Sequence, residues 1–133
     1  MANINWRAVA VGIVTSIVIG LLGGAAIPFT SDTLPVIGQG LSGLVAGLAA
    51  GYVAGGDYGN GALNGAVATT LGAIVLGILF LVFGTLFAGI FGLGFALVYF
   101  IIVALYAIPG AIGGAIGSAI KGRRARPTEE PIA

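Results

Sequence analysis

Residues 58–120 read YGNGALNGAVATTLGAIVLGILFLVFGTLFAGIFGLGFALVYFIIVALYAIPGAIGGAIGSAI, a run of 63 positions without Asp, Glu, Lys or Arg. A membrane-spanning helix needs about 20 apolar residues, because the hydrocarbon core of a bilayer is roughly 30 Å thick and a helix rises about 1.5 Å per residue. The run therefore accommodates two generous spans or three short ones. Two further uncharged stretches, 8–31 and 33–56, each accommodate one span.

The composition indicates a membrane protein and excludes several other classes. Of the 133 residues, 59% are hydrophobic and 7% are charged, whereas soluble domains carry about 25% charged residues. The absence of Cys and His excludes disulfides, thiolate catalysis and histidine-ligated metals. We therefore expect no cofactor and no enzymatic activity. A net charge of +1 argues against nucleic-acid binding, which requires a basic face.

The distribution of basic residues predicts four crossings of the membrane. The only basic cluster is KGRRAR, residues 121–126, and the positive-inside rule keeps it in the cytoplasm. Arg7 places the N-terminus on the same side, so the number of crossings is even. We predict an all-α integral membrane bundle in the cell membrane, with both termini cytoplasmic. Its transmembrane domain covers residues 1–122, with spans at about 8–27, 34–54, 62–83 and 90–112.

Two boundaries have alternatives. Pro109 predicts a kink, and residues 110–120 either continue the fourth helix or form a separate short helix at the interface. Residues 123–133, with two prolines, are expected to form a disordered cytoplasmic tail.

At the N-terminus, Arg7 and the apolar run after it also match a cleavable signal peptide. That run is about 20 residues long, however, against the usual 7–15 or so.

Small residues recur at every fourth position in the predicted helices. Lipid tails are as apolar as Leu, so helices in a bilayer associate by close packing, which small residues permit. These stripes are therefore predicted to pack helix against helix, either within one bundle or, for the stripe on the second helix, against another subunit. The predicted packing residues are Gly12, Ser16, Gly20, Gly24, Gly43, Gly47, Gly51, Gly55, Gly61, Gly65, Gly110 and Gly114.

The loop GGDYGNG, residues 55–61, carries the polar groups that lie closest to the spans. Arg7 and Asp57 are both expected at the cytoplasmic edge and form a candidate ion pair; the alternative is two independently solvated charges. Asp57, Tyr58, Asn60 and Asn64 form a candidate site for a lipid headgroup or a cation. The alternative is turn and cap chemistry, in which Asn60 caps the third helix.

The segment GYVAGGDYGNGALNG, residues 51–65, joins a glycine-rich helix to an acidic loop that bears Asn-Gly. With its four predicted spans, the chain resembles a family of small, glycine-rich, four-helix membrane proteins of archaea whose function is unknown. The resemblance covers residues 6–120. It implies a helical membrane fold and brings no catalytic residues.

Two functions agree with these patterns. The first is a structural or accessory membrane protein that packs tightly and self-associates or binds a membrane protein partner, with membrane lipid around it. The second is an oligomeric small transporter or channel subunit, which would place Gln39, Ser42, Asn64 or Thr69 on a common wet surface.

Overall fold

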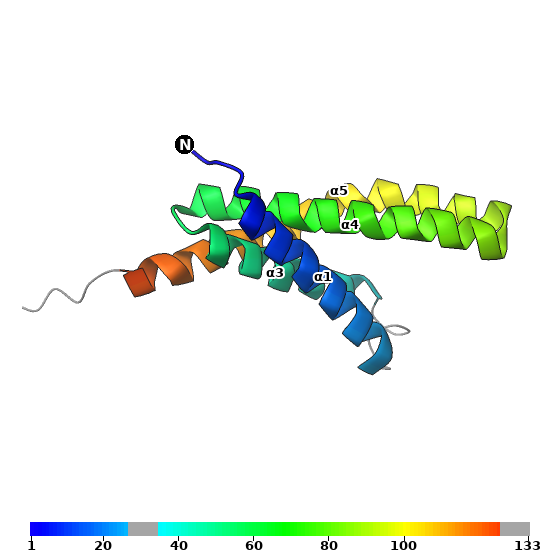
Figure 1. Cartoon of the computed structure of the whole chain (residues 1–133), viewed down its shortest axis with the longest axis horizontal. Coiled ribbons are helices and arrows are strands. Elements are labelled where there is room, and N and C mark those ends of the chain that lie inside the picture. Colours follow the sequence, from blue (N-terminus) through cyan, green and yellow to red (C-terminus); the bar gives the residue numbers. More distant parts are fainter. Residues whose placement is uncertain (27–34, 126–133) are drawn as a thin grey trace, which may run out of the picture.

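The computed structural model describes residues 1–26 and 35–125. Within these ranges it does not describe the side chains of residues 20–26, 35–39, 80, 106 and 125. The described residues form helices and no strand, which confirms the prediction of an all-α fold with four helices. With the labels of Figure 1, the helices are α1 (Trp6–Ala26), α3 (Pro35–Ala54), α4 (Tyr58–Ala88) and α5 (Ile90–Ala125).

The two long helices form a hairpin, and the two shorter helices cover one half of it. In Figure 1, α4 and α5 run side by side, while α1 and α3 lie across the half near the N-terminus and leave the other half uncovered. Contacts join α5 to α3 and α4, and join α1 to α3 and α4. Helices α3 and α4 also contact each other, so these two lie between α1 and α5, which share no contact among the described residues.

Helix α4 begins four residues earlier and ends five residues later than the predicted span of 62–83. The N-cap is Asp57 rather than Asn60, because the Asp57 carboxylate accepts a hydrogen bond of 2.8 Å from the backbone N–H of Asn60. At the other end, Gly89 adopts a φ of 58°, and its N–H donates to the Thr85 carbonyl at 2.9 Å. Gly89 alone therefore connects α4 to α5, and no charged residue in the sequence indicates where this connection lies.

Helix α5 continues through Pro109 to Ala125, so residues 110–120 belong to it and do not form a separate helix. The part of α5 beyond Pro109 runs in a different direction from the yellow part in Figure 1, as expected where a proline removes a backbone donor. Residues 123–125 of the predicted tail are helical, and 126–133 lie outside the described residues. The connection between the first two predicted spans, residues 28–33, also lies outside them.

Large apolar side chains lie on the outside of this fold, and small ones fill its interior. Phe87, Ile90 and Ile101 are each more than 75% exposed. The buried hydrophobic residues are mostly alanines: Ala8, Val9, Ala46, Ala50, Ala68, Ala73, Ala96 and Val103. Within the described residues, α4 and α5 are long and apolar enough to cross a membrane, and Trp6–Ile19 and Gly40–Ala54 are shorter apolar helices.

Candidate functional site: the glycine contacts and the charged end

The glycines of α3 lie directly on the backbone of α5. A Cβ atom built on Gly47 would collide with the carbonyl oxygen of Gly110, and one on Gly51 would collide with that of Gly114. Both pairs are buried. Since no larger side chain fits, the fourfold spacing on each helix places one backbone against the other over a full turn.

The same two glycines of α5 also contact α4. A Cβ on Gly65 would lie 2.8 Å from the Cα of Gly114, and one on Gly61 would collide with the Gly114 carbonyl oxygen and with Ser118. Thr69, one turn further along α4, packs against Gly110 and donates to the Gly65 carbonyl at 3.0 Å. The segment 110–118 of α5 is thus held between α3 and α4.

A second glycine stripe on α5 was not among the predicted packing residues. Gly113 and Gly117 are buried, and Cβ atoms there would collide with the carbonyl oxygens of Leu44 and Leu48 on α3. Gly113 and Gly117 are themselves four residues apart and are offset by one residue from the series of Gly110 and Gly114, and this spacing is the signal that identifies them. Two stripes on one helix indicate that it has two helical neighbours.

Helix α1 uses its predicted small residues against both of its neighbours. A Cβ on Gly12 would lie 2.6 Å from the Cβ of Ala68 on α4 and 2.9 Å from that of Ala50 on α3. Ser16 packs against Gly72, while its hydroxyl donates to the Ile13 carbonyl at 2.7 Å. Of the other predicted positions, Gly43 is buried, and the surroundings of Gly20 and Gly24 lie outside the description.

Gly55 lies beyond the end of α3 and takes a different role from the rest of its stripe. Its φ of +64° is in the left-handed region, which suits a glycine after a helix. The Lys121 stem packs over it, and the Lys121 ammonium donates to the Val53 carbonyl at 2.9 Å. A cation at the C-terminus of a helix also interacts favourably with the helix dipole, so Lys121 fastens the end of α5 to the end of α3.

Asn64 fixes the N-terminal segment of the chain to α4. Its side chain is fully buried; it accepts from the backbone N–H of Asn5 at 2.6 Å and donates to the carbonyls of Asn3 and Asn60 at 2.9 and 2.8 Å. The Asn60 side chain accepts from the Asn3 N–H at 3.0 Å and donates to the Gly55 carbonyl at 2.9 Å. We call residues 3–5, held in this way, the N-terminal strap.

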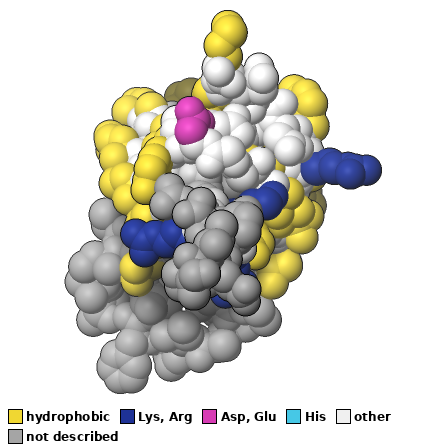
Figure 2. All heavy atoms as spheres, turned by 90° about the vertical axis from the view of Figure 1, so that its left-hand side faces the viewer, with side chains coloured by type: hydrophobic (Ala, Val, Ile, Leu, Met, Phe, Trp, Pro, Cys, Tyr) yellow, Lys and Arg dark blue, Asp and Glu magenta, His cyan; other side chains and the backbone are white. Residues whose placement is uncertain are grey.

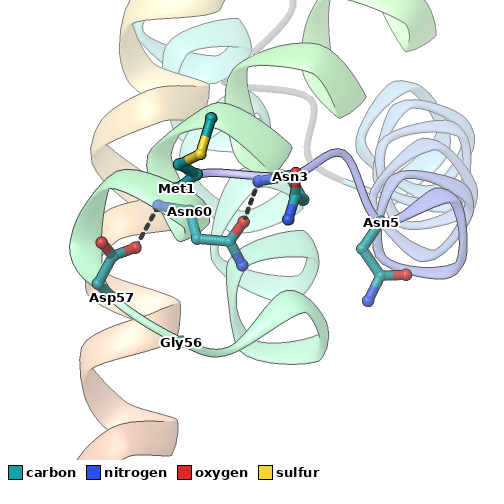
Figure 3. Close-up of a pocket in the computed structure, with 6 residues that line it drawn as sticks. All are labelled: Met1, Asn3, Asn5, Gly56, Asp57 and Asn60. Atoms are coloured by element: carbon teal, nitrogen blue, oxygen red, sulfur yellow. Dashed lines mark hydrogen bonds between the residues drawn. The ribbon is translucent and has the colours of Figure 1, made fainter.

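The strap and the loop at residues 55–61 line a cavity of about 320 Å³, which is shown in Figure 3. Met1, Asn3, Asn5, Gly56, Asp57 and Asn60 line it. Three members of the predicted loop site, Asp57, Asn60 and Asn64, therefore lie close together, but their bonds go to the cap and the strap. Tyr58 lines other cavities instead. Asp57 therefore caps α4, whereas Asn60 and Asn64 also bond to the strap, a connection that neither alternative predicted.

The charged side chains of the described residues gather at one end of the molecule. This end combines the start of α1, the loop between α3 and α4, and the end of α5, and Figure 2 shows its basic and acidic groups on a single face. Among described residues, no ion pair joins Arg7 to Asp57; the Asp57 carboxylate accepts from the Asn60 N–H instead. The charged residues are Arg7, Asp57, Lys121, Arg123 and Arg124.

These features define an all-α protein that is held together by glycine contacts, carries its described charges at one end, and has two helices long and apolar enough to cross a membrane. The chain belongs to the family of unknown function DUF5518, whose model matches residues 6–120. No curated protein and no solved structure matches it.

Proposed function

We propose that the chain is a multi-pass integral membrane protein with a structural or accessory role. All four helices cross the bilayer, and the charged end lies at the cytoplasmic surface. The exposed apolar side chains of α4 and α5 support this arrangement, because lipid is the solvent that covers such a surface without cost. The gathering of Arg7, Lys121, Arg123 and Arg124 at one end supports it as well, because basic residues concentrate on the cytoplasmic side.

The observation that carries the structural role is the pairing of the small-residue stripes within one chain. Gly47 and Gly51 face Gly110 and Gly114 of the same molecule, which supports packing of this stripe within one bundle rather than against another subunit. The contacts favour a bundle that closes on itself and offers its outer surface to lipid or to a membrane protein partner.

The transporter alternative receives no comparable support. It requires polar side chains on a common wet surface, but Asn64 and Thr69 are buried and bonded to backbone carbonyls or N–H groups of their own chain. Such bonds act as connections between or within helices. The side chain of Gln39 lies outside the description.

The first experiment measures the mass of the purified protein in detergent and in nanodiscs, with the variants Gly47→Leu and Gly40→Leu. Gly40 lies on the same helix, and a Cβ there meets nothing within 4 Å. We expect wild type and Gly40→Leu to be monomers of similar thermal stability. Gly47→Leu should unfold at a markedly lower temperature, because overpacking costs about 1–3 kcal/mol or more.

The contrary outcome is a discrete wild-type oligomer that Gly47→Leu converts to a monomer of unchanged stability. That result would place the stripe between subunits and would revive the transporter alternative.

A further inference from the structure

Two adjoining cavities lie between the start of α4 and the end of α5, apart from the cavity beneath the N-terminal strap. The first, of about 400 Å³, is lined by the side chains of Asp57, Tyr58, Ser118 and Arg123 and by nearby glycine and alanine residues. The second, of about 270 Å³, is lined by Tyr58, Ala115, Ile116, Ala119, Ile120 and Arg123. Tyr58, Ala119 and Arg123 line both, so the two cavities adjoin. We call the first the polar cavity, because Asp57 and Ser118 line it, and the second, lined mainly by alanine and isoleucine, the apolar cavity.

The polar cavity holds two opposite charges that do not meet. Asp57 and Arg123 both line it, yet no ion pair joins them among the described residues. The Asp57 carboxylate accepts from the Asn60 N–H, and the Lys121 ammonium is directed to the Val53 carbonyl. Of the described basic residues, Arg123 is the one that lines the cavity, and Tyr58, which also lines it, has a hydroxyl that can donate.

We propose that these two cavities bind one membrane phospholipid whose headgroup carries an amine as well as a phosphate. The phosphate accepts hydrogen bonds from the Arg123 guanidinium and the Tyr58 hydroxyl, as phosphates do with arginine. The headgroup ammonium lies toward Asp57. One acyl chain follows the apolar cavity along Ala115, Ile116 and Ile120.

The lining favours this occupant over two others. A headgroup with phosphate alone would pair with Arg123 but would leave the Asp57 carboxylate near a negative charge with no cation of its own, which is unfavourable. A small water-soluble zwitterion would leave the apolar cavity empty, beside the exposed side chain of Ile116. The proposal rests on the proposed membrane location, since a lipid reaches the site only if the charged end lies at the bilayer surface.

The test is native mass spectrometry of the purified chain in detergent, titrated with dioleoyl phosphatidylethanolamine or dioleoyl phosphatidylglycerol. The two lipids share acyl chains and phosphate, and only the first carries an amine. We expect wild type to retain phosphatidylethanolamine about tenfold better, a ratio of the size that one charge-assisted bond produces. Arg123→Gln should lower retention of both lipids about tenfold.

Two further variants separate the roles of the charges. Asp57→Asn keeps a good N-cap residue and should abolish the preference between the lipids while leaving the thermal stability near that of wild type. Arg124→Gln is the matched control: Arg124 neighbours Arg123 on α5 but lines neither cavity. It should change retention by less than about twofold, as expected of an exposed charge.

Equal binding of the two lipids by wild type would overturn the proposal, and so would equal losses in Arg123→Gln and Arg124→Gln. Alkaline carbonate extraction of membranes tests the underlying location separately. If the chain is released by carbonate, the proposed membrane function fails. If it stays in the membrane and shows no lipid preference, only the lipid site fails.

Discussion

At the scale of single residues, the most consequential side chain is the amide of Asn64. A polar group without exposure to water must be bonded, because an unmet donor or acceptor costs about 1–3 kcal/mol. Asn64 meets this requirement through backbone groups of Asn3, Asn5 and Asn60. The segment before α1 is thereby fixed to α4, which lies far away in the sequence.

We expect Asn64→Ala to lower the free energy of unfolding by about 1–3 kcal/mol, because it leaves the Asn5 N–H and the Asn3 carbonyl unpaired. Asn3→Ala is the control, since Asn3 takes part in these bonds through its backbone and its side chain is exposed. Thermal or denaturant unfolding in detergent measures both variants. Equal stabilities would show that the strap contributes nothing.

At the scale of elements, α5 organises the fold, because it alone carries two glycine stripes in one segment. Gly110 and Gly114 contact both α3 and α4. Gly113 and Gly117 contact α3. This arrangement explains why the helix continues past Pro109: backbone contacts from two neighbours hold the segment 110–118. The sequence pattern led us to predict the first stripe; the second has the same fourfold spacing, but it was not predicted.

Alanine substitution at two glycines of α5 distinguishes packing from helix propensity. Gly114→Ala should destabilise by about 1–3 kcal/mol, because its Cβ meets the backbone of Gly61 and Gly65 and the helices must separate. Gly94→Ala should stabilise by up to about 1 kcal/mol, because a Cβ there meets nothing within 4 Å and Ala is the better helix former. Unfolding of both variants in the same detergent gives the comparison. Changes of the same sign would contradict the packing role.

At the scale of the whole molecule, the chain is polarised along its length. The described charges lie at the end where α1 begins and α5 finishes, and the hairpin turn at Gly89 is remote from them and uncharged. The four crossings that we propose would place the charged end on one side of the membrane and the turn on the other. A chain without cysteine allows this topology to be tested directly.

Single cysteines introduced at Ala2, Ala88 and Gly122 should divide into two groups. In intact cells, a membrane-impermeant maleimide should label Ala88→Cys from outside, and Ala2→Cys and Gly122→Cys only after the cells are opened. All three positions are exposed, so access depends on the side of the membrane. Labelling of Ala2→Cys and Gly122→Cys from opposite sides would refute an even number of crossings.

The sequence by itself determined the helical class, the four helices and the small-residue faces, since these depend on local composition and on the helical repeat. The tertiary structure decided which faces meet. Because small residues are spaced by four on every helix, the sequence pattern alone is compatible with several contact partners for Gly47. The structure identifies Gly110 as the partner. It also decided that Asn64 binds the strap and that Gly89 alone turns the chain, because both depend on groups brought together only by folding.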